Sequence, residues 1–89
     1  MSTNPLPIYD KRMLELIDLL ISLRTIKSKQ DFYNVIGIAK QQGNSIKNGI
    51  GSFKSEHILK ACIEFNANPG WIFGFENTVF RIKSGNKSG

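Results

Sequence analysis

The chain has 89 residues, 40% of them hydrophobic and 21% charged, which suits one small globular domain and excludes a binding domain joined to a separate catalytic domain. Its single cysteine excludes an intrachain disulfide and favours a reducing compartment. The apolar stretch near the N-terminus contains acidic residues and is far shorter than the roughly 20 residues that cross a bilayer. We therefore expect a cytoplasmic protein with no secretory signal and no membrane attachment.

The formal net charge of +5 is concentrated in the middle of the chain. Residues 24–54 contain six basic side chains and one acidic side chain, whereas the flanking segments are nearly neutral. A localised basic stretch is the electrostatic pattern expected of a protein that binds nucleic acid. A lysine-rich face that is merely solvated has the same charge, so charge alone leaves both interpretations open.

The prolines near the N-terminus predict an extended arm over residues 1–9, because proline and the residue before it resist helix formation. A first helix is predicted from Asp10 to Arg24, where apolar residues recur at spacings of three and four. Its inner stripe is Met13, Leu16, Ile17, Leu20 and Leu23, widened by Leu14, Leu19 and Ile21. A stripe of this width can cover a partner as well as the core.

A second, short helix is predicted between Ser28 and Gly37. Ser28 and Asp31 fit a capping pattern in which the serine oxygen accepts a free backbone amide and the acid suits the positive helix start. Gly37 can adopt the left-handed conformation that ends a helix. The inner residues of this helix are Phe32, Val35 and Ile36.

Residues 40–48 predict a third helix, which is polar except at Ile46 and ends in the turn-forming pair Asn48-Gly49. On a helix, one narrow inward stripe is formed by Gly43, Ile46 and Ile50. The residues that then face outward are Lys40, Gln41, Asn44, Ser45 and Lys47.

An amphipathic pattern predicts a fourth helix from Lys54 to Phe65, and Asn68-Pro69 supplies the cap and first residue of a short fifth helix. The residues expected to face the core from these helices are Ile58, Leu59, Cys62, Phe65, Trp71, Ile72 and Phe73. The sequence thus predicts an all-α, five-helix domain over residues 10–75. In the tail, residues 76–89, alternation from Val79 to Lys83 is typical of a short strand, and the final SGNKSG is expected to be mobile.

Two short helices joined by a glycine-containing turn, the second almost free of apolar residues, match the requirements of a helix-turn-helix over residues 28–48. Its second helix must enter a major groove about 12 Å wide and present polar groups to base edges. Lys40, Gln41, Asn44 and Ser45 are the residues we expect to read bases. The residues we expect to bind phosphates are Lys29, Gln30, Lys47, Asn48, Ser52 and Lys54.

Residues 28–74 resemble the lambda-repressor-like (Xre family, phage repressor) helix-turn-helix domain. Gly37-Ile38 matches its turn, Ile46 the buried position of its recognition helix and Asn48-Gly49 the end of that helix, and IEFNANPGWIFG resembles the Asn-Pro-x-Trp-Leu-x-x-Gly motif of one phage-repressor-like branch. The resemblance implies a transcriptional regulator, specifically a repressor, that reads double-stranded DNA. It implies base contacts from Lys40, Gln41 and Ser45, with Asn44 and Gln42 secondary.

Three residues depart from the family pattern. Tyr33 replaces a small residue, Ala39 replaces a capping serine or threonine, and Gly43 replaces isoleucine or valine. A missing cap and an interior glycine each cost about 1 kcal/mol, so we expect a recognition helix that frays in the free protein and becomes ordered on DNA. We hypothesise that Tyr33 fills the space left at Gly43, so that isoleucine at this position destabilises the fold.

The wide stripe of the first helix and the strand-like tail predict a homodimer on an inverted-repeat operator. His57 and Cys62 point about 140° apart on a helix, which disfavours a metal site and leaves Cys62 in the core and His57 facing solvent. Trp71 and Phe73 fit the core better than a base-stacking platform. Scattered carboxylates offer no catalytic group, so we expect no enzyme activity, cofactor or small-molecule substrate. The alternative is a protein–protein interaction module that keeps the fold without specific DNA binding.

Overall fold

Helices account for most of the residues that the computed structural model describes, which are residues 6–81. The five helices of this part of the chain are α1 (Ile8–Ser22), α2 (Lys29–Ile36), α3 (Lys40–Lys47), α4 (Ser55–Phe65) and α5 (Pro69–Ile72). The predicted all-α class is confirmed. The predicted mobile end, and the last two residues of the predicted strand, lie outside the described residues.

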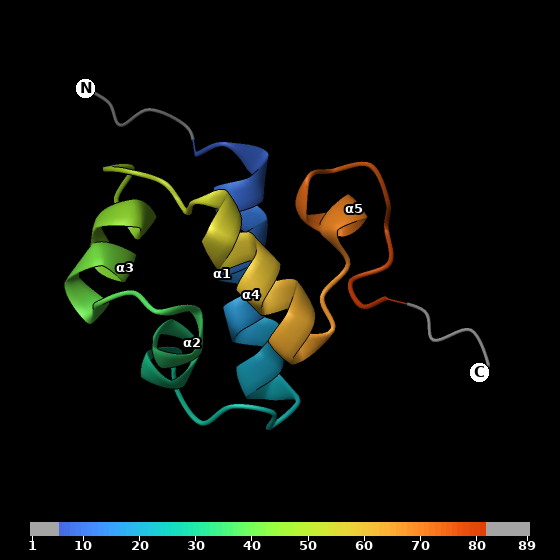
Figure 1. The fold of residues 1–89 in the computed structure, drawn as a ribbon, viewed down its shortest axis with the longest axis horizontal. Coiled ribbons are helices and arrows are strands. Elements are labelled where there is room, and N and C mark those ends of the chain that lie inside the picture. Colours follow the sequence, from blue (N-terminus) through green and yellow to red (C-terminus); the bar gives the residue numbers. More distant parts are fainter. Residues whose placement is uncertain (1–5, 82–89) are drawn as a thin grey trace.

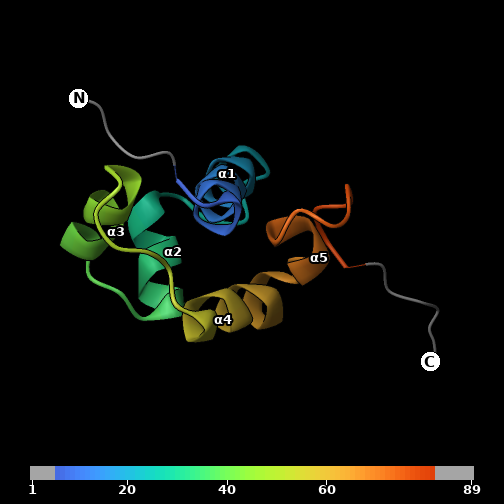
Figure 2. The same cartoon turned by 90° about the horizontal axis from the view of Figure 1, so that it is seen from above.

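Two crossing helices, α1 and α4, occupy the middle of the molecule, with α2 and α3 on one side and α5 on the other (Figures 1 and 2). The core lies where these elements meet, and Met13, Leu16 and Phe32 are completely buried in it. The ring of Phe32 stacks on Phe65 of α4, with centroids 5.3 Å apart. On the other side, the guanidinium of Arg12 lies 4.8 Å from the ring centroid of Trp71, which joins α1 to α5.

The first helix begins and ends two residues earlier than the apolar pattern predicted. It starts at Ile8 behind Pro7, so residues 8 and 9 are helical and not part of an extended arm. Proline is tolerated here because a helix start has no acceptor for its missing N–H. The helix ends because Arg24 adopts a left-handed φ of 63°, and Thr25 N donates to Leu20 O at 2.9 Å. Leu23 is therefore exposed and does not face the core.

Three other residues expected in the core are exposed. Ile50 is 69% exposed because α3 ends first: Gly49 has a φ of 86° and directs the chain away from the helix axis. Leu59 is 59% exposed because α4 buries the face that carries Ile58, Ala61 and Cys62, and Leu59 lies beyond the edge of that face. Phe73 is also exposed, since α5 has already ended at Ile72.

The tail forms a single antiparallel bridge within the described residues, between Ala67 and Phe80, where a short strand was predicted. Asn68 N donates to Val79 O at 2.8 Å, and Arg81 N donates to Asn66 O at 2.9 Å. The predicted cap of α5 is confirmed, because the Asn68 side chain accepts a hydrogen bond from Gly70 N at 3.0 Å. No helix in residues 6–81 is both long enough and apolar enough to cross a membrane.

Candidate nucleic-acid interface

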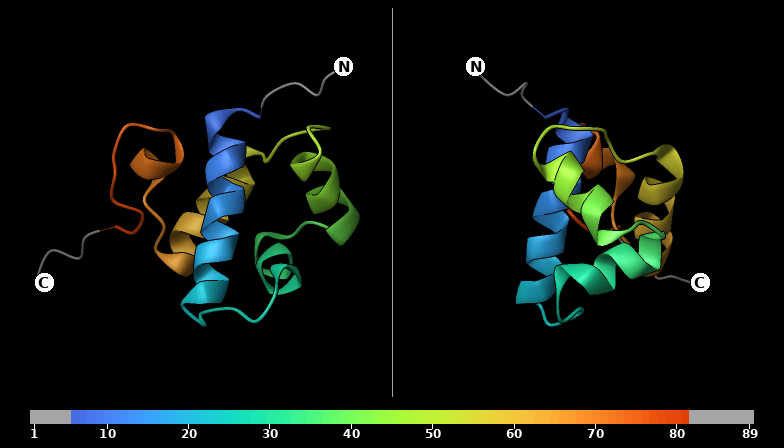
Figure 3. Two further views of the ribbon diagram at one scale, coloured as in Figure 1. Left: turned by 180° about the vertical axis from the view of Figure 1, so that it is seen from behind. Right: turned by 90° about the vertical axis from the view of Figure 1, so that its left-hand side faces the viewer.

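The α2–turn–α3 unit is set by residues at the ends of its helices. Gly37 ends α2 with a left-handed φ of 84°, and both Gly37 N and Ile38 N donate to Tyr33 O. The chain then turns into α3, which packs against α2 on one side of the molecule (Figure 3). Ala39 occupies the N-cap of α3 without a side-chain hydrogen bond, as expected from its sequence. The predicted glycine turn between α2 and α3 is therefore confirmed, and so is the predicted lack of a side-chain cap on α3.

α3 buries two residues, Gly43 and Ile46, and carries polar side chains elsewhere. Of the predicted base-reading residues, Lys40, Gln41, Gln42 and Asn44 are exposed and Ser45 is half-buried. A period of 3.6 residues puts Gln41, Asn44 and Ser45 on the face opposite the buried pair. Lys40 and Lys47 lie on one flank of that face, and Gln42 lies on the other. α3 runs from Lys40 to Lys47, so Asn48 of the predicted 40–48 helix is its C-cap.

A large residue of α2, Tyr33, fills the space beside a small residue of α3, Gly43. Tyr33 is only 2% exposed, and a Cβ atom added to Gly43 would lie 2.7 Å from both Cε atoms of its ring. This confirms the hypothesis that Tyr33 occupies the space left at Gly43. Burial raises the pKa of the Tyr33 hydroxyl; Lys29 opposes the rise and Asp18 adds to it.

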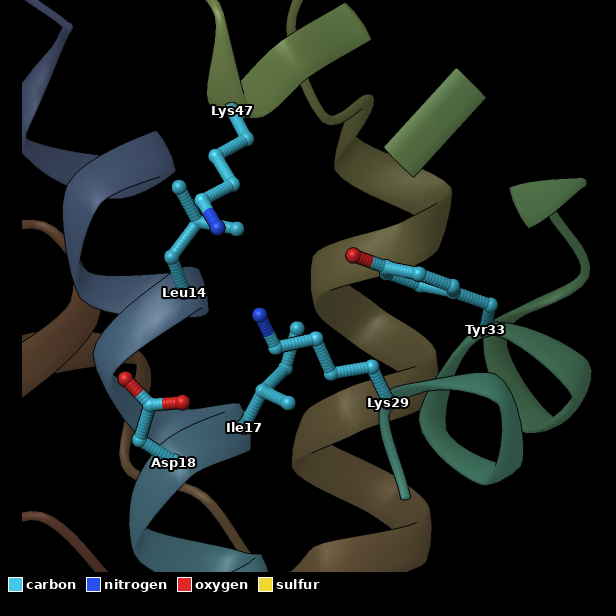
Figure 4. A pocket seen from close by; sticks show the side chains of 6 residues that line it. All are labelled: Leu14, Ile17, Asp18, Lys29, Tyr33 and Lys47. Carbon is cyan, nitrogen blue, oxygen red and sulfur yellow. The ribbon is translucent and has the colours of Figure 1, made fainter. Parts of the chain in front are cut away.

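A cavity of about 80 Å³ adjoins the Tyr33 ring where α1, α2 and α3 meet, and Figure 4 shows its lining residues. They are Leu14, Ile17, Asp18, Lys29, Tyr33 and Lys47. Lys29 and Lys47, predicted from different helices to bind phosphates, both extend toward this space (Figure 4). The structure thus brings these two cations onto one side of the α2–α3 pair.

The start of α2 differs from the predicted capping arrangement. Ser28 is the N-cap residue, but its side chain makes no capping hydrogen bond in the described structure. The Asp31 carboxylate instead accepts a bond from Lys27 N at 2.9 Å, although Ser28 has the extended backbone that is usual for an N-cap residue. Both predicted phosphate-binding residues of this turn, Lys29 and Gln30, are exposed. The first turn of α2 therefore leaves backbone amides available to an anion.

The remaining predicted phosphate-binding residues lie in and beside the loop that joins α3 to α4. Asn48 and Lys54 are exposed, and Ser52 is half-buried. The loop contains Gly49 and Gly51, both at positive φ. These residues lie together in one loop, as the sequence predicted, but the sequence did not indicate which contacts hold the loop in place.

Two buried polar residues contact this loop, and neither was predicted. The Asp10 carboxylate is completely buried, and its Oδ1 accepts a hydrogen bond from Phe53 N at 2.9 Å. His57 was expected to face solvent but is buried. Its Nδ1 accepts a hydrogen bond from Lys54 N at 3.0 Å. This bond runs from the N-cap amide to the third helical residue, the place where glutamate or glutamine completes a capping box. That spacing was the available signal for His57; Asp10 had none, because its partner is 43 residues away.

Burial also determines the chemistry of the histidine and the cysteine. It lowers the pKa of His57, and Lys54 adds to this while Glu56 opposes it. Cys62 is buried, so the expectation that it lies in the core is confirmed; burial raises the pKa of its thiol, with Arg81 opposing. Among residues 6–81, no three His, Cys, Asp or Glu side chains gather closely enough to hold a metal ion.

The opposite side of the molecule carries an apolar surface on α4 and α5. Leu59, Ile63 and Phe73 are exposed there and line a groove between the two helices. By contrast, Leu14 and Ile21 of α1 pack against the core, so the wide stripe of α1 is largely used within the domain. Exposed apolar residues also occur elsewhere, at Ile8, Leu23 and Ile50, whereas Leu59, Ile63 and Phe73 line one groove.

No family model, curated protein or solved structure matches this chain. Functional inference therefore starts from the geometry of α2, α3 and the loop after α3.

Proposed function

We propose that the chain is a sequence-specific double-stranded DNA-binding regulator, a repressor with a lambda-repressor-like helix-turn-helix, and that α3 is its recognition helix. One observation carries this proposal. α3 buries Gly43 and Ile46 against the domain and exposes a polar face, which is the division of residues that a helix needs to lie in a major groove. Gln41, Asn44 and Ser45 on that face, with Lys40 and Gln42 on its flanks, carry the donors and acceptors that bind base edges.

The distribution of charge supports the same partner. All six basic side chains of residues 24–54 are exposed, and they lie on α2, α3 and the adjoining loops. The one acidic residue of this segment, Asp31, is half-buried and bonded to the backbone. Lys29, Gln30, Lys47, Asn48, Ser52 and Lys54 are the proposed phosphate contacts. Such contacts fix position and affinity without reading sequence.

In the proposed mechanism, two copies of the chain bind an inverted repeat, with one α3 in each major groove and half-sites about 10 bp apart. Occupation of the operator then blocks access to a promoter. Each bidentate contact from Gln41 or Lys40 discriminates between bases by about 1 to 3 kcal/mol.

The decisive experiment is selection of bound sites from random duplex DNA, followed by fluorescence anisotropy on the selected duplex. We expect an enriched inverted repeat and, if five bases contact phosphates, a log K against log salt slope of about −4 to −5 per protomer. Failure to enrich any sequence, together with a flat salt response, refutes the proposal.

A second candidate function is supported by the α4–α5 surface. Leu59, Ile63 and Phe73 expose apolar area that a protein partner could cover, as in an interaction module that keeps this fold without specific DNA binding. Substitution Leu59→Lys separates the two candidates. It abolishes partner binding in an interaction module, whereas each α3–half-site contact of a DNA-binding protein is unaffected.

A further inference from the structure

The loop between α3 and α4, residues 48–54, carries three of the proposed phosphate contacts but no helix or strand of its own in the described structure. Gly49 and Gly51 adopt φ values of 86° and 83°, which allow the chain to turn sharply. Because glycines also widen the range of accessible conformations, the position of this loop depends on a few fixed points.

Five backbone amides of the loop donate hydrogen bonds, and the first two, those of Asn48 and Gly49, bond to carbonyl oxygens of α3. Ile50 N donates to Ser45 O at 2.8 Å, which ties the start of the loop to α3. Lys54 N donates to His57 Nδ1 at 3.0 Å, which ties its end to α4. Each of these bonds joins the loop to the helix beside it in the chain. Phe53 N donates to Asp10 Oδ1 at 2.9 Å, and this bond reaches α1.

The Asp10 side chain pays a clear cost for this position. It is completely buried, and its Oδ2 has no hydrogen-bond partner among the described residues. Burying a charged group with an unsatisfied oxygen is unfavourable, and an apolar residue would avoid it. Two features compensate in part: the first turn of α1 favours an anion, and a bond from an N–H to a carboxylate is stronger than one between neutral groups.

We propose that Asp10 is a positioning residue for DNA binding. By accepting the Phe53 N–H, its carboxylate holds residues 48–54 against α1, so that Asn48, Ser52 and Lys54 meet the phosphates in a preformed arrangement. The Phe53 ring strengthens the anchor, because it is buried edge-on against the His57 ring with centroids 6.4 Å apart. This inference rests on the proposed function and adds a residue of α1 that does not itself touch DNA.

The test compares Asp10→Ala, which removes the acceptor, with Asp10→Asn, which keeps an acceptor oxygen and removes the charge. Glu15→Ala is the matched control, since it removes an exposed acidic side chain from the same helix. Two quantities are measured: hydrogen exchange of the Phe53 amide in the free protein, and affinity for the selected duplex and for an unrelated duplex.

For Asp10→Ala we expect at least tenfold faster exchange at Phe53 and about tenfold weaker binding to both duplexes. Asp10→Asn and Glu15→Ala should stay within about threefold of the wild type in both measurements. If Asp10→Ala does not fold, the scalar coupling across the Phe53 N–H to Asp10 hydrogen bond in the wild-type protein, free and DNA-bound, decides the matter. Its absence overturns the inference.

Equal losses for Asp10→Ala and Asp10→Asn with unchanged Phe53 exchange would also overturn it, because charge and not anchoring would then be responsible. A wild-type chain that binds no duplex DNA refutes the proposed function itself. Wild-type binding that Asp10→Ala leaves unchanged refutes only the role of Asp10.

Discussion

Substitution Gly43→Ala should destabilise the domain, although alanine is the better helix former. In an exposed helix interior this change gains about 1 kcal/mol. Here the new Cβ would lie 2.7 Å from the Cε atoms of Tyr33, closer than carbon atoms pack, and the ring is 2% exposed. Overpacking of this kind costs about 1 to 3 kcal/mol.

The cost of overpacking by Gly43→Ala depends on how far the Tyr33 ring can move into the cavity beside it. Its volume of about 80 Å³ lets Tyr33 move part of the way, so a cost near 2 kcal/mol is reasonable. After the helix-propensity gain, the free energy of unfolding should fall by about 1 kcal/mol, which lowers Tm by about 4 to 8 °C in a domain of this size. Gly43→Ile adds more atoms at the same place and should lower it further.

Urea unfolding followed by circular dichroism measures both effects, and a second background isolates the cause. In Tyr33→Leu, which lacks the ring carbons that meet the new Cβ, Gly43→Ala should become stabilising by about 1 kcal/mol, because only the helix propensity remains. Gln42→Ala, an exposed neighbour, should change stability by less than about 0.5 kcal/mol in either background. A stabilising Gly43→Ala in the wild-type background, or the same effect in both, would refute the reasoning.

Three further predictions concern binding, pH and the end of α1. Gln41→Ala should change which DNA sequence is selected, whereas Lys29→Ala should weaken binding to all sequences alike and reduce the salt slope by about 1. Fluorescence anisotropy on matched and mismatched duplexes checks both. A changed sequence preference with Lys29→Ala would contradict the assignment of Lys29 to a phosphate. Because burial lowers the His57 pKa below 6.5, the unfolded chain takes up the proton first. The contribution of His57 to the free energy of unfolding should therefore be constant above pH 6.5 and fall as the pH drops toward the folded pKa. His57→Gln should remove that part of the pH dependence in unfolding titrations, and an unchanged profile would exclude His57 as its source. Arg24→Gly should stabilise the domain by about 0.5 to 1 kcal/mol, because Arg24 has a left-handed φ of 63°. Thermal unfolding measures this, with Lys27→Gly, at an exposed position outside a helix, as the control. An equal effect of both substitutions would argue against backbone strain at Arg24.

Features set by neighbouring residues were predictable from the sequence. Gly37 and the Asn48-Gly49 pair fix the ends of α2 and α3 through local backbone conformation, so the predicted ends of these two helices are correct within one residue. The match of Tyr33 to Gly43 was also predictable, because a large and a small residue had replaced their opposites on helices already expected to touch.

Features that depend on distant parts of the chain were not predictable. Periodicity gave α4 an apolar stripe, but Ile58 and Leu59 fit it equally well, and only the packing of α4 on the rest of the domain buries one and exposes the other. Arg24 gave no signal for a left-handed residue, since arginine seldom ends a helix in this way. The prediction placed the N-cap of α2 correctly at Ser28 but not its hydrogen bond: the serine side chain makes none, and Asp31 accepts one from Lys27 N.

The bond from Phe53 to Asp10 has a consequence for protein engineering. It joins two residues 43 positions apart, and the intervening chain contains all of α2 and α3. The α2–α3 pair therefore lies between two segments of chain that bond to each other, α1 before it and the loop after it, and it is not an independent unit. A graft of residues 24–54 onto another scaffold would have to bring a buried acceptor for the Phe53 amide, or the loop would arrive without its anchor.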